Sequence, residues 1–170
     1  MPTVVVMGTL DTKGAELQYV QRIIAESGLN TLLMDTGVLG TPSIKADIPR
    51  EEVARAGGQD LSQLVAREDR GEAITVMTAG AAKIARQLYD EGRLQGIISL
   101  GGSAGTTIGT AAMRALPVGV PKVMVSTLAS GDTRPYVDTK DICMMYSVVD
   151  IAGLNRLSKT ILGNAARAIA

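Results

Sequence analysis

The chain has 170 residues, and its 17 Lys and Arg residues balance its 17 Asp and Glu residues. This length suits one domain with its own core, and the balanced charge gives no field of one sign to attract nucleic acid or a membrane surface. The chain contains no His, Phe or Trp. The absence of His removes the usual zinc ligand and excludes Ser-His-Asp and Cys-His catalysis within this chain. The absence of Phe and Trp predicts an aliphatic core and removes most stacking platforms for single-stranded bases.

The amino-terminal apolar run has no basic region and is too short for a signal peptide. No segment approaches the ~20 apolar residues of a membrane span, so we expect a cytoplasmic protein. The lone Cys143 cannot form an internal disulfide and lies in an apolar run. We therefore expect its side chain to be a small buried hydrophobe.

Five short apolar runs predict strands that are buried on both faces, as in a parallel sheet covered by helices. In chain order they are 4–8, 31–35, 96–100, 122–126 and 142–146. Apolar residues with a 3.6-residue period predict four helices between and after these strands. The first ends at Gly28, the second spans 71–91, the third stops before Pro117, and the last runs through 154–168 with Asp150 or Asn155 as its cap.

This alternation predicts one α/β domain over residues 1–170. We expect a three-layer, doubly wound, Rossmann-like domain with a mainly parallel five-stranded sheet in the order 2-1-3-4-5. Residues 36–70, between the second strand and the following helix, are too long for a plain connection and hold one short helix candidate after Pro49. Excursions of this length usually form a lid, a partner surface or a contact with another domain.

In this strand order, the sheet reverses direction between its first and third strands, and such sheets bind ligands in the crevice at that reversal. Two small-residue loops flank it, namely "GTLDTKG" at 8–14 and "LGGSAGTT" at 100–107. The predicted lining residues of the first loop are Gly8, Thr9, Asp11, Thr12 and Lys13. Those of the second loop are Gly101, Gly102, Ser103, Gly105, Thr106 and Thr107.

A phosphate group suits the second loop, because free amides at a helix start and bare glycine backbone let an anion come close. The hydroxyls of Ser103 and Thr106 would add donors, and Lys13 could supply a full charge. The alternative is a plain strand-to-helix turn in which glycine provides a positive φ. Two loops that face each other at the predicted reversal favour phosphate binding.

No standard nucleotide fingerprint is present, since the chain lacks both G-x-x-x-x-G-K-[ST] and G-x-G-x-x-G after the first strand. Asp35 ends the second strand, where an acid can bind ribose hydroxyls; equally, it could be a turn acid before Gly37. Asp11 beside Lys13 could hold Mg²⁺ against a phosphate. We prefer the alternative, in which Asp11 or Thr12 caps the first helix.

A third loop follows the fourth strand and reaches the same edge of the predicted sheet. It could contribute Ser126, Thr127, Ser130 and Gly131 to the ligand site. Asp132 and Arg134 are more simply explained as solvated charges. No catalytic pair or metal-ligand cluster can be identified, so the pattern indicates a binding protein more clearly than a catalyst.

Several segments together resemble one known family, the ATP-binding domain family named after the plant tomato-mosaic-virus resistance protein. They are "GTLDTKGAEL", "RGEAITVM", "IISLGGSAGTT", "LPVGVPKVMVSTLASGDTRPYV" and "YSVVDIAGLNRLSKTILGNAA". The likeness runs in order through nearly the whole chain. It implies a nucleotide site whose GGSxGT pattern falls on 101–106, whose GTxDTK pattern falls on 8–13, and whose Ser-Thr and Ser-Gly fall on 126–131. It also implies that this chain matches only the amino-terminal half of longer members, whose second α/β lobe could close the site.

The leading functional hypothesis is binding of ATP, or of a related phosphorylated ligand, with Mg²⁺ as a candidate companion ion. A second hypothesis is a protein-interaction or dimerisation module with a structural nucleotide, and a homodimer is the expected state. A third is half of a sugar-phosphate or nucleotide-sugar enzyme that uses Asp11 as a base. No nucleic-acid or membrane partner is expected.

Overall fold

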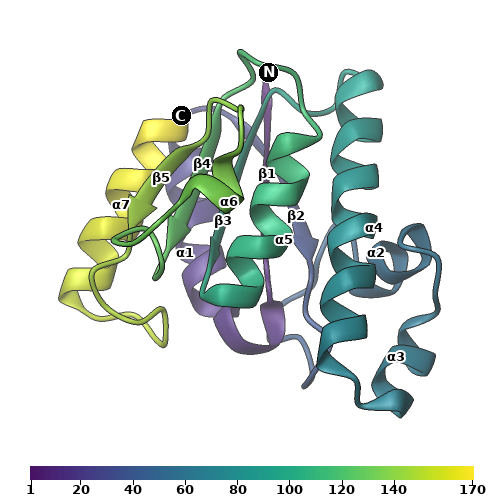
Figure 1. Ribbon diagram of the computed structural model, residues 1–170. Helices are drawn as coiled ribbons and strands as arrows, with labels where there is room; N and C mark the ends of the chain where they lie inside the picture. The colour runs from purple at the N-terminus through teal and green to yellow at the C-terminus, as the bar shows by residue number, and fades with distance from the viewer.

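A computed structural model describes all 170 residues as alternating strands and helices around one sheet (Figure 1). The strands are β1 (Thr3–Gly8), β2 (Asn30–Asp35), β3 (Gly96–Gly101), β4 (Lys122–Ser126) and β5 (Cys143–Tyr146). The helices are α1 (Leu10–Glu26), α2 (Arg50–Ala56), α3 (Leu61–Arg67), α4 (Arg70–Asp90), α5 (Ser103–Arg114), α6 (Arg134–Val137) and α7 (Arg156–Ile169). The predicted class of an α/β domain is confirmed.

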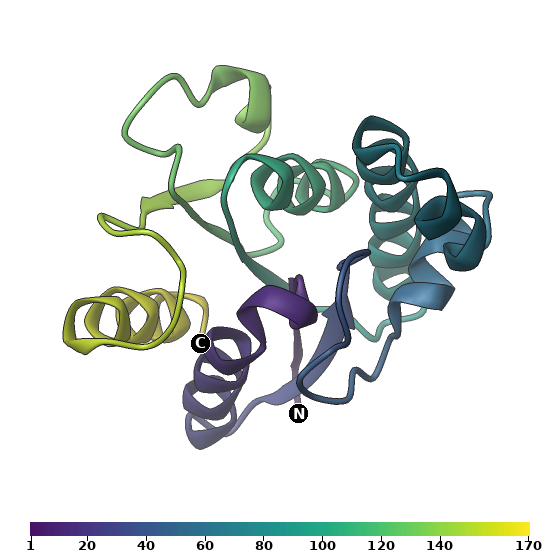
Figure 2. The same cartoon turned by 90° about the horizontal axis from the view of Figure 1, so that it is seen from below.

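All neighbouring strands are parallel, and their order is β2-β1-β3-β4-β5, as predicted. Helices α1 and α7 pack together on one face of the sheet, while α4 and α5 pack together on the other (Figure 2). The domain therefore has the three layers of a doubly wound, Rossmann-like fold.

The two faces of the sheet feed two separate aliphatic cores. Along β1, Val4 and Val6 face α1 and α7, whereas Val5 and Met7 face the other helical layer. Because successive side chains of a strand point to opposite faces, the continuous apolar run of β1 fills both layers. The central strands β1, β3 and β4 are almost entirely buried, as expected for a covered parallel sheet.

The fifth strand departs from this pattern, and the expectation for Cys143 is wrong. Strand β5 hydrogen-bonds only to β4 and forms an edge of the sheet. Cys143 and Tyr146 are exposed at its two ends. Its apolar composition resembles that of the central strands, but the helices cover it less completely because it lies beyond α5 and α7.

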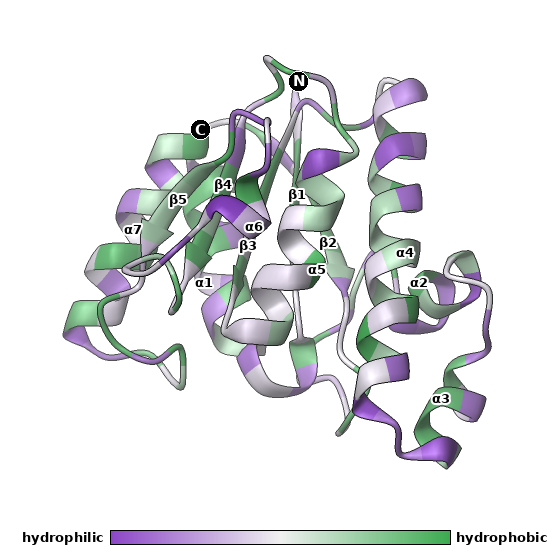
Figure 3. Ribbon diagram, viewed as in Figure 1, coloured by the Kyte–Doolittle hydropathy of each residue, from purple (hydrophilic) through white to green (hydrophobic).

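Local signals set most helix ends. Gly28 has a φ of +84° just after α1, the conformation in which glycine commonly ends a helix. Asn155 caps α7 in a capping box with Ser158, which decides between the two predicted caps. Helix α4 matches the helix predicted over 71–91 and shows hydrophilic residues at intervals along its length (Figure 3).

The long excursion after β2 covers one end of the α4 layer. The predicted helix after Pro49 is α2, and a second short helix, α3, follows it. Helices α2 and α4 approach so closely that a Cβ added to Gly80 would lie 1.9 Å from the Val53 carbonyl oxygen. Buried Ile48, Val53 and Leu64 thereby join the core that α4 shares with the sheet.

None of the helices combines the length and the hydropathy that a membrane-spanning segment requires.

A buried ammonium group stands at the start of β4. The Lys122 side chain is fully buried, and its Nζ donates hydrogen bonds to the carbonyl oxygens of Pro117 and Val120 and to Asp141 Oδ1, at 2.7, 2.8 and 2.8 Å. The hydrogen bond from Lys122 is the main cause that lowers the pKa of Asp141 to about 2. This pair ties the start of β4 to the connection before β5.

Replacing Asp141 by Asn should lower the free energy of unfolding near neutral pH, because the buried Lys122 loses its only carboxylate partner. The folded pKa of Asp141 lies below its ordinary value of 3.8. The carboxylate therefore contributes stability above that value and loses it as the pH falls towards about 2.

Urea unfolding followed by circular dichroism from about pH 6 to about pH 2 would measure this difference. The difference in the free energy of unfolding between the wild type and Asp141→Asn should become smaller as the pH falls. Asp60→Asn, an exposed carboxylate outside every ion pair, serves as the control. A gap that stays constant with pH would contradict the role given to the pair.

Candidate ligand site at the carboxyl edge of the sheet

The predicted loops meet at one edge, because parallel strands all end on the same side of a sheet. Gly8 lies opposite Asp35 in the ladder, and Gly101 lies opposite Ser126. A Cβ added to Gly8 would lie 3.5 Å from the Leu100 carbonyl oxygen. The fold therefore brings the ends of β1, β2, β3 and β4 side by side, and with them the beginnings of the loops that hold the predicted residues.

The glycines of the β3–α5 turn allow a close backbone approach. A Cβ added to Gly101 would lie 2.6 Å from the Gly105 Cα, which a side chain could not occupy without displacing backbone. Gly102 has a φ of −84°, and no glycine of this turn has a positive φ. The interpretation that these glycines provide a positive φ is therefore wrong. Their role is to bring the end of β3 against the first turn of α5.

The first turn of α5 leaves amide hydrogens free. Helix bonding begins where the Thr106 amide donates to the Gly102 carbonyl oxygen at 2.8 Å, and no side chain caps the helix. The preceding amides of Ser103, Ala104 and Gly105 donate to no acceptor within the chain. Ser103 is exposed, while Ala104 and Gly105 are half-buried. An uncapped helix start of this kind offers both hydrogen bonds and positive partial charge to an anion.

Two of the predicted hydroxyls point inward. Thr106 Oγ1 and Ser126 Oγ lie 2.6 Å apart, and both residues are fully buried. Ser126 Oγ also accepts the Leu128 amide at 3.0 Å, and the Thr127 amide donates to the Gly101 carbonyl oxygen at 3.2 Å. These bonds hold the third loop against the β3–α5 turn.

The remaining hydroxyls and glycine of these loops are more accessible. Thr127 Oγ1 would lie 3.7 Å from a Cβ added to Gly102, so it borders the turn. Thr107 Oγ1 donates to the Ser103 carbonyl oxygen within α5. Ser130 and Gly131 are exposed on the third loop, beyond the bonds that fix its beginning.

The β1–α1 loop is held by its own contacts. Thr9 precedes α1 without capping it through its side chain, and its Oγ1 lies 2.7 Å from Thr12 Oγ1. The preferred interpretation of Asp11 or Thr12 as a helix cap is therefore wrong. Lys13 interrupts the helix with a φ of −131°. Its Nζ donates to the Ile151 carbonyl oxygen at 2.8 Å, so this charge binds the β5–α7 loop.

Asp35 joins the first loop to the segment after β2. It is 1% exposed, and its Oδ1 accepts the Leu10 amide at 3.1 Å and the Gly37 amide at 2.8 Å. Burial raises the pKa of this carboxyl, and the two amide hydrogen bonds oppose that change. In this conformation the Asp35 carboxylate accepts backbone hydrogen bonds from both segments and so holds them together.

Asp11 contacts two residues that lie far from it in the sequence. Its Oδ2 accepts the Leu39 amide at 3.0 Å and lies 3.9 Å from Arg50 Nη1. Arg50 also donates to the Gly40 carbonyl oxygen at 2.6 Å. Thirty-nine positions separate Asp11 from Arg50, so no local spacing signals the pair. The helix candidate after Pro49 was the only indication of where Arg50 would lie.

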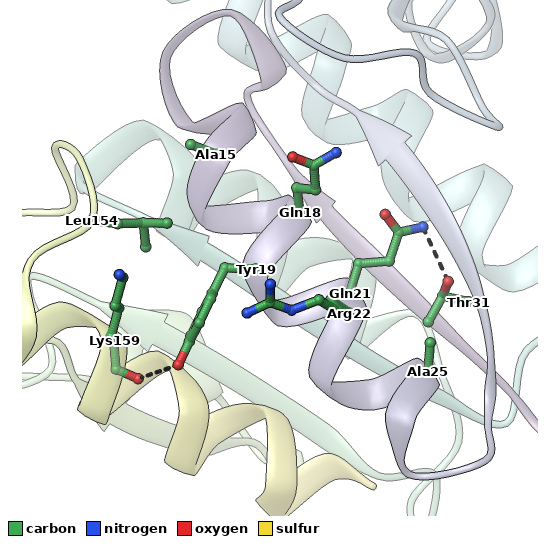
Figure 4. A pocket seen from close by; sticks show the side chains of 9 residues that line it. All are labelled: Ala15, Gln18, Tyr19, Gln21, Arg22, Ala25, Thr31, Leu154 and Lys159. Carbon is green, nitrogen blue, oxygen red and sulfur yellow. Dashed lines mark hydrogen bonds between the residues drawn. The ribbon is translucent and has the colours of Figure 1, made fainter.

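A groove of about 550 Å³ lies elsewhere, between α1 and α7 (Figure 4). Arg22 lies over the Tyr19 ring, 5.4 Å from its centre, and Tyr19 Oη donates to the Lys159 carbonyl oxygen at 3.2 Å. None of the predicted site residues lines this groove. No three acidic or Cys side chains gather where they could hold a metal ion.

Residues 2–170 match the family described as "Uncharacterised protein family (UPF0261) N-terminal domain". The chain belongs to this family. A UPF0261 protein of Clostridium tetani is 54% identical over 166 residues, which cover 98% of this chain and 41% of that protein. A UPF0261 protein of Mesorhizobium japonicum is 46% identical over 172 residues, covering the whole of this chain and 42% of the relative.

The ToMV resistance protein Tm-1 of tomato (Solanum lycopersicum) is 36% identical over 186 residues, which cover 99% of this chain and 24% of the plant protein. The resemblance drawn from the sequence segments is thereby confirmed at the level of the family. The chain spans about two fifths of the bacterial UPF0261 relatives and a quarter of the tomato protein. It is similar to their shared amino-terminal region.

The glycine contacts make the stability of the β3–α5 turn testable. Gly101→Ala should lower the free energy of unfolding by about 1–3 kcal/mol, because the added methyl group overlaps the backbone of Gly105. Gly102→Ala should cost less, since its Cβ meets only Thr127 Oγ1 at 3.7 Å. Thermal unfolding of the two variants side by side measures the order. An equal or reversed order would contradict the close approach.

Proposed function

We propose that this UPF0261 domain binds ATP, or a related phosphorylated ligand, with its phosphate groups at the first turn of α5. The observation that carries the proposal is the set of three amides, Ser103, Ala104 and Gly105, that have no acceptor within the chain. They follow Gly101 and Gly102, which place no side chain over them. Backbone amides at a helix start bind phosphate oxygens through hydrogen bonds and through the helix dipole.

Nearby groups support the same chemistry. The exposed hydroxyl of Ser103 and the Thr127 hydroxyl beside Gly102 can add hydrogen bonds to phosphate oxygens. Thr9, just before α1, and Thr12, in the first turn of α1, lie at the other side of the point where the sheet reverses. Ligands of open α/β sheets bind at such a reversal. Lys13 would have to leave the Ile151 carbonyl oxygen before it could contribute its charge.

Mg²⁺ would accompany ATP mainly through the phosphate oxygens and water, since this ion needs only one or two protein ligands. Asp11 Oδ1 is buried without a hydrogen-bond partner, which fits either a cation or a hydrogen-bond donor. The guanidinium of Arg50, 3.9 Å from the same carboxylate, disfavours a second cation there. The ion therefore fits better on the phosphate side of the site, where it would neutralise the charge of the nucleotide.

We propose binding alone for this domain, because it corresponds to only part of the longer UPF0261 proteins. The chain covers 41% of the Clostridium tetani protein, whose remaining residues could close the site. We also propose that the protein is cytoplasmic, because the exposed and unpaired thiol of Cys143 suits a reducing compartment.

Isothermal titration calorimetry with ATP and Mg²⁺ tests the proposal. Gly102→Val should weaken binding by about tenfold or more, because branched methyl groups would crowd the free amides. Ala79→Val adds the same branching to an exposed position of α4 and should leave the affinity unchanged. Equal affinities for the wild type and Gly102→Val would remove the loop from the site, and a wild type that binds no ATP would overturn the proposed function.

A second candidate is self-association through β5, favoured by the unpaired edge of this strand and by its exposed Cys143 and Tyr146. Two identical edges can pair about a two-fold axis. Light scattering should then give twice the monomer mass, and Cys143→Lys should give the monomer mass by placing a charge on the edge. Ala79→Lys is the control on α4. A monomeric wild type would contradict this candidate.

A further inference from the structure

Asp11 and Arg50 form a buried pair whose hydrogen bonds are incomplete. The Asp11 side chain is 2% exposed and that of Arg50 is 14% exposed. The Leu39 amide and Arg50 Nη1 both approach Asp11 Oδ2, but Asp11 Oδ1 has no hydrogen-bond partner. Arg50 Nε is also buried without a hydrogen bond, although Glu51 lies 3.8 Å from it. One buried acceptor and one buried donor therefore stand unused on side chains in contact.

Unused polar atoms of this kind are costly, since a buried acceptor or donor without a partner loses its hydration and gains nothing in return. Native structures contain few of them, so each requires an explanation. The two atoms here are complementary, because Oδ1 can only accept a hydrogen bond and Nε can only donate one. A single hydroxyl group could satisfy both by donating to Asp11 and accepting from Arg50.

Gly37 packs directly against the carboxylate of Asp11. A Cβ added to Gly37 would lie 2.8 Å from Asp11 Oδ1 and 2.9 Å from Oδ2, so any other residue at this position would crowd the carboxylate. The amide of the same glycine donates to Asp35 Oδ1. Asp35 therefore holds Gly37, whose missing side chain spares Asp11 a clash. Because Asp11 Oδ1 is buried in this conformation, the loop of residues 37–43 would have to move aside for a hydroxyl group to reach it.

The loop of residues 37–43 lies over this pair. The Leu39 amide binds Asp11, the Gly40 carbonyl oxygen binds Arg50, and the Ser43 amide and hydroxyl bind the Leu10 carbonyl oxygen. Asp11 belongs to the first turn of α1, two residues after Thr9. The pair thus borders the same edge of the sheet as the proposed phosphate site.

We infer that Asp11 and Arg50 bind a sugar hydroxyl of the ligand whose phosphates lie at α5, which makes the ligand a nucleoside phosphate or a sugar phosphate. This inference rests on the proposed function. A phosphate group in place of the hydroxyl would be repelled by Asp11 and Asp35, and a metal ion would be repelled by Arg50. A neutral hydroxyl is repelled by none of these charged groups, nor by the carboxylate of Glu51 beside Arg50.

Titration calorimetry with ATP and with a dideoxy analogue that lacks both ribose hydroxyls tests the inference. The wild type should bind ATP about tenfold more tightly than the analogue, the effect of one charge-assisted hydrogen bond. Asp11→Asn should lower the affinity for ATP by a similar factor and leave the affinity for the analogue unchanged. The amide retains the shape of the side chain and an acceptor for the Leu39 amide. The titrations are repeated with EDTA in place of Mg²⁺. The wild type should still bind ATP more tightly than the analogue.

Gly37→Ala supplies a second variant that keeps the carboxylate and crowds it with a methyl group. It should reproduce the selective loss of ATP affinity, while Gly40→Ala on the same loop, whose Cβ would lie 3.8 Å from Asp11 Cβ, should bind as the wild type does. Thermal unfolding confirms that each variant folds. Equal wild-type affinities for ATP and the analogue, or equal losses for both ligands in Asp11→Asn, would overturn the inference and leave phosphate binding intact. A loss confined to Mg²⁺ would assign Asp11 to a metal instead. Failure of the wild type to bind either ligand would overturn the proposed function and the inference with it.

Discussion

The parallel pairing of β1 with β3 is the constraint on which the candidate site depends. It places the β1–α1 loop and the β3–α5 turn at one edge, although about ninety residues separate them in the chain. Asp35 then ties the first of these loops to the segment after β2 through the Leu10 and Gly37 amides. The close approach of Gly101 to Gly105 sets the start of α5 directly against the end of β3. These contacts bring the first turn of α5, with its free amides, to the edge of the sheet where the other loops begin.

The sequence predicted the strands and their order because continuous apolar runs, glycine punctuation and right-handed crossovers leave few alternatives. It did not predict α3 or α6, which have seven and four residues and too few turns to show a period. Cys143 was misjudged for a related reason. An apolar run does not tell whether its strand is central or at an edge, and the cover of β5 depends on where α5 and α7 lie.

At the candidate site, the sequence identified the loops better than the roles of individual residues. Lys13 was expected to offer its charge, yet a carbonyl oxygen 138 positions away takes its hydrogen bond. Thr106 and Ser126 were expected as donors to a ligand, and they bond to each other across two loops. Arg50 escaped notice because its relation to Asp11 exists only after the 37–43 loop folds back. Such pairings join distant segments, so no motif or local spacing encodes them.

The aliphatic core has a consequence for how the molecule can be observed. The four tyrosines lie at the surface or half-buried, and the chain has no Trp or Phe. Tyr89 and Tyr19 pack against the outside of the two cores. The near-ultraviolet absorbance and intrinsic fluorescence of the protein will therefore come from these few partly exposed tyrosines alone. A single indole placed in the chain by substitution would emit against a dark background. At Leu39, which is 78% exposed on the loop above Asp11, it would report the movement of that loop alone.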